Sequence, residues 1–229
     1  MKNLKLAAVC LSCLTMTGCS ALNFSVEGLI NAPKLTSEQS EIHQALIESV
    51  GSNITLKYPK NGEYRSAYVI ANIDDEPTDE AMVFYEYTSN GSEEDGLRVN
   101  ILDKDEDGKW YSVKELAGAG TDIDQVIISP MGSNNQTDVF VGYQNLTNDE
   151  KTMEIYSYTD GDFKRVALDT YSVLEPLDIN NDGYIELITI QRSTNNDTGA
   201  VTAKASMLNM KNNEITRGES VDMCDNVTS

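Results

Sequence analysis

The sequence predicts a mainly β protein with one short helix near its N-terminus. From residue 51 onward, short runs rich in β-branched and aromatic residues alternate with polar turns, and no helical period separates them. A polar loop with an apolar run on each side occurs three times, at spacings of 58 and 48 residues. A repeat of about 50 residues with roughly four strands per copy is typical of the blades of a β-propeller. We therefore expect a partial β-propeller of about four-stranded blades.

The N-terminal helix is predicted over 36–50. Thr36 and Gln39 match a capping box, in which the first residue caps the helix and the second lies three positions later. Apolar residues then recur at helical spacing, at Ile42, Leu46, Ile47 and Val50. Gly51 follows and favours the end of the helix at this point.

Twelve strands are predicted after the helix. They are expected at 54–59, 64–70, 81–87, 97–102, 110–116, 123–129, 139–144, 152–158, 163–168, 171–177, 187–192 and 201–208. Several turns carry dipeptides that tolerate a positive φ, namely Asn61-Gly62, Asn90-Gly91, Asp107-Gly108, Asp160-Gly161 and Asp182-Gly183. Strands without helices between them exclude a doubly wound α/β fold and leave a sandwich, a barrel or a propeller.

The three repeated loops favour the propeller. They span 72–80, 130–138 and 178–186, align without gaps, and each has a carboxylate at its ninth position. Acidic hairpin turns are common, so a chance alignment is the alternative. The apolar runs before and after each loop align as well, which favours a true repeat. Residues 51–229 hold only three to four such units, whereas a closed propeller needs at least four. We therefore expect either a C-terminally truncated piece of a longer propeller or an open array of blades.

Residues 1–18 are predicted to be a signal peptide. Lys2 and Lys5 precede an apolar run at 6–14 that is too short to span a bilayer as a mature helix. The stretch Met16-Thr17-Gly18-Cys19 resembles a bacterial lipobox, in which the cysteine receives a diacylglycerol and the peptide is cut before it; palmitate is the further acyl group expected. We therefore expect Cys19 to be a lipid anchor, residues 19–35 to form a tether, and the protein to lie at the extracytoplasmic face of the cell membrane. An ordinary secretory signal is the alternative.

The charge excludes one class of partner. The chain has 37 acidic and 17 basic residues and a net charge of −20, and a nucleic-acid binder needs a basic face instead. The charge becomes −22 once the two lysines of the signal peptide are removed. A body with this charge is repelled by anionic lipid and should stand off the membrane surface. Cys224 is then the only cysteine beside the anchor, so no disulfide within the mature chain is expected.

The loop Asp178-x-Asn180-x-Asp182-Gly183-x-x-Glu186 resembles the calcium loop of FG-GAP/VCBS repeats, the blade type of integrin-α-like propellers. Residues 19–229 as a whole resemble bacterial surface lipoproteins that carry such repeats. In those proteins a lipobox, a short helix and a stretch like Tyr58-Pro59-x-x-Gly62-x-Tyr64-Arg65-Ser66-Ala67 precede the blades. The resemblance implies an architecture more than an activity.

The resemblance also implies a structural calcium ion. Calcium takes six to eight hard oxygen ligands, and a nine-residue loop supplies side chains at positions 1, 3, 5 and 9 and a backbone carbonyl at position 7. The ligands in the third loop would be Asp178, Asn180, Asp182, the carbonyl of Tyr184, and Glu186. The alternative is a solvated turn held by its own side-chain-to-backbone hydrogen bonds.

The other acidic loops match this pattern less well. The loop at 72–80 has Pro77 where the third loop has glycine, and the loop at 130–138 has Pro130 and Gly132 at ligand positions. We expect the second of these to be free of metal. The segment 103–111 also resembles a calcium loop, but its pattern favours the tip of a hairpin.

No catalytic motif occurs in the sequence. A nucleophile elbow, a phosphate-binding loop and a metalloprotease helix are all absent, and a Ser-His-Asp triad would have to use His43, the only histidine, from within the predicted helix. We therefore expect no enzyme but a binding or scaffolding module for an unknown protein or glycan. Two alternatives stay open: an accessory or sensor subunit of an envelope complex, and a carbohydrate-active enzyme with its site on the propeller face.

Overall fold

The computed structural model describes residues 35–88, 96–131, 137–145, 150–195, 197–211 and 214–223. The chain divides into two compact units, Met1–Thr36 and Ser37–Ser229, and the second contains every helix and strand described here. The predicted signal peptide, Cys19 and Cys224 lie outside the described residues. Within those residues, no helix has both the length and the apolar character needed to cross a membrane.

The predicted helix is confirmed as α3, Ser37–Val50. It buries Ile42, Ala45 and Leu46, which lie on one face at the spacing that the sequence shows. Gly51 has a φ of +84°, and its N–H donates to the carbonyl of Ile47 over 2.9 Å, which ends the helix.

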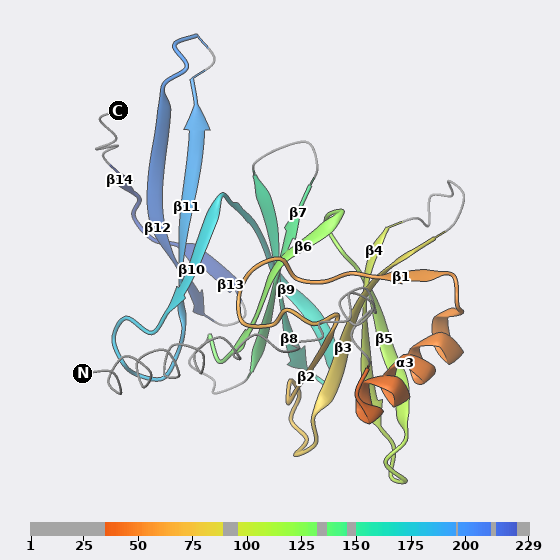
Figure 1. Cartoon of the computed structure of the whole chain (residues 1–229). Coiled ribbons are helices and arrows are strands. Elements are labelled where there is room, and N and C mark those ends of the chain that lie inside the picture. The colour runs from red at the N-terminus through yellow and green to blue at the C-terminus, as the bar shows by residue number, and fades with distance from the viewer. Residues whose placement is uncertain are drawn as a thin grey trace, which may run out of the picture. The chain divides into compact units, whose positions relative to one another are not determined.

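The strands form three antiparallel sheets (Figure 1). Sheet A contains β1 (Ile54–Leu56), β2 (Tyr68–Ala71), β3 (Glu80–Tyr87), β4 (Leu97–Lys104) and β5 (Trp110–Ala117). Sheet B contains β6 (Asp122–Ser129), β7 (Asp138–Gln144), β8 (Lys151–Thr159) and β9 (Asp162–Tyr171). Sheet C contains β10 (Val173–Leu177), β11 (Glu186–Thr194), β12 (Val201–Lys211), β13 (Glu214–Arg217) and β14 (Val221–Met223).

The mainly β prediction is confirmed, and each of the twelve predicted strand regions contains a strand. The region 54–59 is a strand only to Leu56, and the region 64–70 becomes one only at Tyr68. Strands β13 and β14 were not predicted. Of the predicted turn glycines, those at 62, 108, 161 and 183 have positive φ, while Asn90-Gly91 lies outside the described residues. None of the three sheets closes on itself in the part of the chain that the structure describes.

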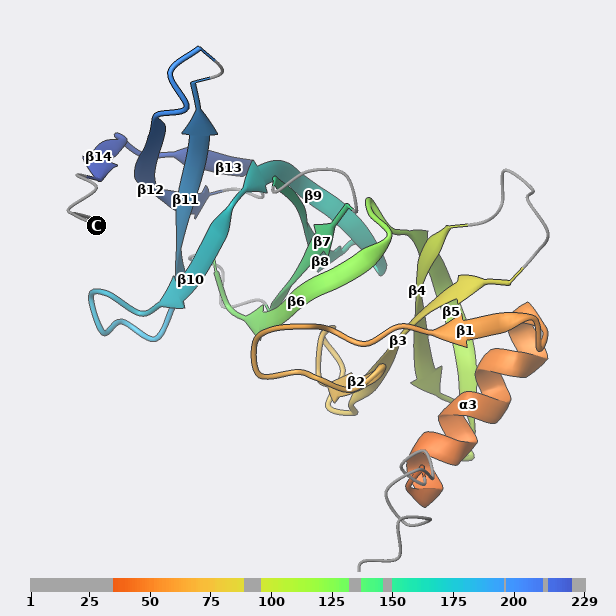
Figure 2. The same cartoon turned by 45° about the horizontal axis from the view of Figure 1, so that its top comes forward.

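Sheet A is covered on both faces. Alternate residues of β3 point to opposite sides. Val83 and Tyr85 pack with Leu46 of α3, whereas Met82 and Phe84 belong to a core shared with sheet B. The helix therefore covers one face of sheet A and sheet B covers the other (Figure 2).

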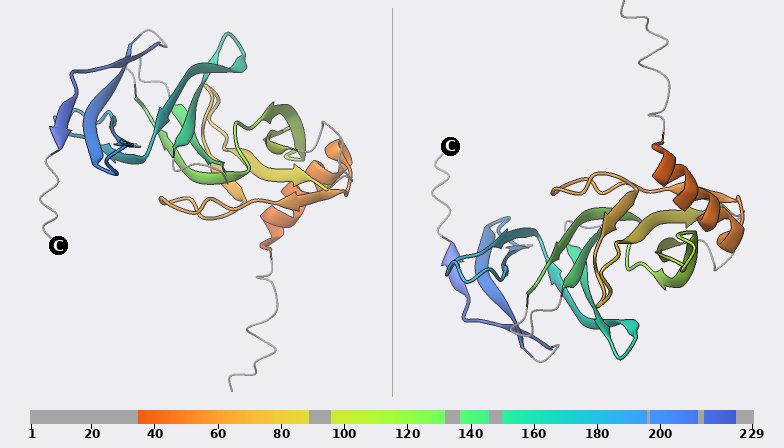
Figure 3. Two further views of the ribbon diagram at one scale, coloured as in Figure 1. Left: turned by 90° about the horizontal axis from the view of Figure 1, so that it is seen from above. Right: turned by 90° about the horizontal axis from the view of Figure 1, so that it is seen from below.

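Sheet B is also packed on both faces. Val139 and Val141 of β7 belong to the core shared with sheet A. Phe140 of the same strand packs with Leu187 of β11 and Leu208 of β12, in a core shared with sheet C. Through the cores the order is thus α3, sheet A, sheet B and sheet C, which is the order along the chain (Figure 3).

Candidate functional site

The three repeated loops lie at equivalent places in the sheets. Each one connects two strands that are consecutive in the chain and paired in one sheet, from β2 to β3, from β6 to β7 and from β10 to β11. In each loop the backbone N–H of the second residue donates to the carboxylate of the ninth. The three distances are 2.8 Å from Ile73 to Glu80, 3.1 Å from Met131 to Asp138 and 2.9 Å from Ile179 to Glu186. The ninth carboxylate thus holds the start of its loop against the start of the following strand.

Two of these three carboxylates are buried. Asp138 accepts a further hydrogen bond from the hydroxyl of Ser157, and burial raises its pKa. Glu80 is 1% exposed, and its second oxygen has no hydrogen-bond partner among the described residues. Burial, together with the nearby charges of Asp74 and Asp103, raises the pKa of Glu80 to about 7. The ninth position therefore serves the fold in sheets A and B.

The third loop is exposed and winds around its own side-chain oxygens. The carboxylate of Asp178 accepts the N–H groups of Asp182 at 3.1 Å and Gly183 at 3.0 Å. The carboxylate of Asp182 accepts the N–H of Tyr184 at 2.9 Å. Gly183 and Asn181 have φ values of +89° and +59°, which allow the chain to turn sharply enough for these bonds.

Asn180 connects the remaining predicted ligands. Its side-chain nitrogen lies 3.0 Å from an oxygen of Asp182 and 3.2 Å from an oxygen of Glu186. Its own oxygen accepts the N–H of Asp182 at 2.9 Å. The structure thus brings the four predicted side-chain ligands into one network. The carbonyl of Tyr184, the fifth predicted ligand, belongs to the same turn.

The donor set of this loop fits a calcium ion by its chemistry, since three carboxylates and an amide are hard oxygen donors. Its present hydrogen bonds are those of a turn held by its own side chains. Across the described ranges, no three His, Cys, Asp or Glu side chains are arranged as a ready metal-binding group. Asn180 donates N–H groups to the two carboxylates that a cation would otherwise contact.

The first loop is held differently. The side-chain amide of Asn72 donates to the carbonyl of Glu76 at 2.5 Å and to that of Thr78 at 3.1 Å. Thr78 is the counterpart of Tyr184, so the carbonyl that would bind calcium already has a donor. The second loop lies partly outside the described residues. Residues 105–109 form the turn between β4 and β5, where Asp105 accepts the N–H groups of Asp107 and Lys109.

A polar cavity of about 530 Å³ lies beside β6 and β10. Its central group is Asp124, which is 2% exposed and accepts three hydrogen bonds. The donors are Asn61 at 2.7 Å, Lys151 at 2.8 Å and Tyr171 at 2.7 Å. Burial and the contact with Asp124 raise the pKa of Tyr171, so its hydroxyl keeps the proton that it donates.

The connection between β1 and β2 reaches this cavity by docking on sheet B. The backbone N–H groups of Lys60 and Asn61 donate to the carbonyls of Ile123 and Asp124, at 3.1 Å and 2.7 Å. Gly62 has a φ of +81° and lies against Gln125, so a side chain there would be strained. The chain thus leaves sheet A after β1, docks on sheet B, and returns to sheet A as β2. The sequence did not reveal the cavity, because four distant segments form it.

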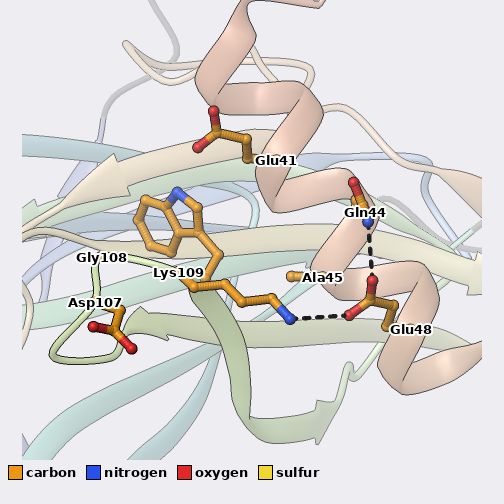
Figure 4. Close-up of a pocket in the computed structure, with 8 residues that line it drawn as sticks. Glu41, Gln44, Ala45, Glu48, Asp107, Gly108 and Lys109 are labelled. Atoms are coloured by element: carbon orange, nitrogen blue, oxygen red, sulfur yellow. Dashed lines mark hydrogen bonds and ion pairs between the residues drawn. The ribbon is translucent and has the colours of Figure 1, made fainter.

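A second cavity, of about 290 Å³, lies between α3 and the β4–β5 turn (Figure 4). Glu48 of the helix accepts a hydrogen bond from Gln44 at 3.0 Å and lies 3.8 Å from the ammonium of Lys109. Trp110 lines this cavity, and its indole N–H has no hydrogen-bond partner among the described residues. The pair of Glu48 and Lys109 is exposed, so it contributes little to stability.

His43 lies in neither the loops nor the cavities. Its Nδ1 is 2.8 Å from the hydroxyl of Tyr68, and the two rings meet edge to face. The histidine thus joins α3 to β2 as a packed residue.

No protein-family model matches this chain, and no curated protein matches it.

Proposed function

We propose that the protein is a lipoprotein of the extracytoplasmic face, anchored through Cys19, whose sheets form a binding or scaffolding module with a calcium-stabilised loop at 178–186. The main support is the network in which Asp178, Asn180, Asp182 and Glu186 contact one another in one exposed loop. The hydrogen bond shared by the three loops supports the view that sheets A, B and C are successive blades of a partial propeller of the FG-GAP/VCBS type.

Calcium would stabilise the junction of β10 and β11. It would take over from the Asn180 N–H groups as the partner of Asp182 and Glu186, and Asp178 and the carbonyl of Tyr184 would complete the protein ligands. The ion would cancel charge where three carboxylates meet. A loop held in this way keeps the first two strands of sheet C in register.

The polar cavity beside β6 and β10 is where we expect a glycan or a protein ligand to bind. It combines Asp124 and Lys151 with the amide of Asn61 and the apolar side chains of β10. Polar groups of both kinds on an apolar wall are typical of ligand pockets. The packed position of His43 favours binding over catalysis by a histidine-dependent triad.

The calcium proposal is tested by following the melting temperature of the full chain while calcium is added after chelation. A ligand that binds only the folded state stabilises it by about 2.7 kcal/mol at a hundredfold excess over its dissociation constant. We expect calcium to raise the melting temperature of the natural chain but not of Asp182→Ala. Asp107→Ala, which removes a carboxylate from another Asp-Gly turn, is the matched control and should respond like the natural chain. The proposal is wrong if millimolar calcium causes no shift, or the same shift in Asp182→Ala.

The anchor is tested by fractionating bacteria that express the full chain. Cys19→Ala removes the thiol that would carry the lipid, so we expect loss of labelled fatty acid and release from the membrane fraction. Cys13→Ala changes a cysteine of the predicted signal peptide and should keep both. A Cys19→Ala chain that still incorporates fatty acid would rule out this anchor.

A further inference from the structure

The outer face of sheet C, the face turned away from sheet B, carries apolar side chains, of which Ile188 and Ile190 are half-buried and Met207 and Val221 are exposed. Along β11, Leu187 belongs to the core with sheet B, so Ile188 and Ile190 point the other way. Cross-strand pairing places Met207 of β12 beside Ile188. Ala205 of β12 lies between Ile190 and Val221 of β14 and pairs with both, so these three residues form a second row across the sheet. Met207 and Val221 are 38% and 67% exposed. Exposed apolar surface of this extent marks an interaction site.

The equivalent faces of the other two sheets are covered. In sheet A, Met82 and Phe84 lie two and four positions after Glu80, the ninth residue of the loop at 72–80. Both side chains pack in the core shared with sheet B. Phe140 has the same place in sheet B and packs in the core with sheet C. Ile188 and Ile190 have this place in sheet C. In both cases the outer face of one sheet packs against the inner face of the next, so the outer face of sheet C is the face of this kind that no described sheet covers.

The charges at its edges match those of the same face in a second copy. Glu175 is on β10 in the row of Ile188, and Arg192 is on β11 one row beyond Ile190. Both are exposed. When two such faces meet with their strands antiparallel, each Arg192 approaches the row of the other copy that carries Glu175. A two-fold interface needs this kind of self-complementarity.

We propose that the outer face of sheet C binds the same face of a second copy of this chain, in a two-fold dimer. The apolar rows pack against each other as two sheets do in a sandwich, about 10 Å apart. The pairs of Arg192 with Glu175 set the antiparallel orientation. Two chains anchored in one membrane would meet at a raised effective concentration, which favours such a dimer.

The test uses the full chain in membranes, with a photo-crosslinking phenylalanine derivative in place of Met207. Irradiation should give a covalent dimer whose crosslink joins two copies of sheet C, as identified by mass spectrometry. The same derivative in place of Val113, an exposed apolar residue of β5, is the matched control and should give none. The proposal is overturned by the absence of a dimer, by an equal yield from position 113, or by a crosslink from position 207 to another protein or to residues 20–34.

Charge reversal tests the orientation without disturbing the core. With the crosslinker in place of Val221, Arg192→Glu should lower the dimer yield several-fold, because like charges then face each other. The double variant Arg192→Glu, Glu175→Arg should restore the yield. An unchanged yield in the single variant, or no recovery in the double variant, would contradict this pairing.

Discussion

Glu80 and Glu154 show two ways of placing a carboxylate in the interior. Glu154, 1% exposed, is paired with the guanidinium of Arg165 and accepts the hydroxyl of Tyr156. Glu80 accepts the N–H of Ile73 on one oxygen, and its other oxygen has no hydrogen-bond partner among the described residues. A charged carboxylate without a cation partner is costly to bury, so the proton is held more tightly and the pKa of Glu80 rises to about 7.

This difference predicts how stability depends on pH. The pKa of Glu80 in the folded chain lies above the value of about 4.3 for an unfolded chain, so the folded state binds the proton more strongly. This stronger binding of the proton stabilises the folded state fully below about pH 4.3, and the stabilisation is lost as the pH rises through about 7. Glu80→Gln keeps an acceptor for Ile73 and removes the charge.

We therefore expect Glu80→Gln to raise the free energy of unfolding by up to about 3 kcal/mol near pH 8 and to change it little near pH 4. Urea unfolding at both pH values, with a chelator present, measures this difference. Equal effects at the two pH values would mean that the charge of Glu80 is not destabilising.

At the scale of an element, β7 depends on a close approach at Gly142. A Cβ at this position would overlap the hydroxyl of Tyr171. That hydroxyl is bonded to the buried Asp124, so it cannot move without losing the bond. The sequence Val-Gly-Tyr in β7 thus keeps glycine in a strand because a tyrosine of β9 fills the space.

Gly142→Ala is expected to lower the free energy of unfolding by about 1–3 kcal/mol, the usual cost of overpacking. Tyr171→Phe in the same chain should recover part of the loss, because it removes the colliding oxygen. Gly96→Ala is the matched control, since its Cβ would meet only the mobile end of Arg98. Denaturant unfolding compares the variants, and equal stability of the two alanine variants would contradict the account.

The helix contributes through one buried face. Leu46 is fully buried against sheet A, and Ile47 beside it is half-buried. Leu46→Ala should cost about 2–5 kcal/mol, because the cavity it leaves cannot fully collapse. Ile47→Ala removes a side chain outside that core and should cost clearly less. Thermal unfolding ranks the two, and the reverse order would mean that α3 does not pack on sheet A as described.

At the scale of the whole molecule, the net charge of −20 predicts a repulsion between like charges that opposes folding. Most described pairs involve partly exposed groups and contribute little each. We expect the melting temperature to rise from about 10 mM to about 0.3 M sodium chloride, with a chelator present, because salt screens the repulsion. A falling melting temperature would show that the ion pairs dominate instead.

The extent to which the sequence predicted the fold differs between segments. Ile42 and Leu46 marked the helix, and the alternation in β5 marked a strand, since both patterns are local. Strands β13 and β14 are four and three residues long, and they pair with two separate parts of β12, at 208–211 and 203–205. Nothing within such short segments distinguishes them from loops.

The candidate site was predictable only in part. The loop at 178–186 was visible because its predicted calcium ligands are neighbours in the chain. The polar cavity was not, because its lining residues, among them Asn61, Asp124, Lys151 and Glu175, come from four separate segments. The strand predicted at 64–70 forms only from Tyr68 onward, since the chain leaves sheet A after β1, bonds to β6 through Lys60 and Asn61, and then returns as β2.

The sequence by itself determined the mainly β composition, the helix, and the position of each acidic loop, because periodicity and turn residues act over a few neighbours. Only the tertiary structure decided which face of each sheet is covered, which carboxylate is buried, and that Asp124 collects three donors. These features depend on contacts between segments far apart in the chain, and burial and pairing there are set by what the opposite sheet presents.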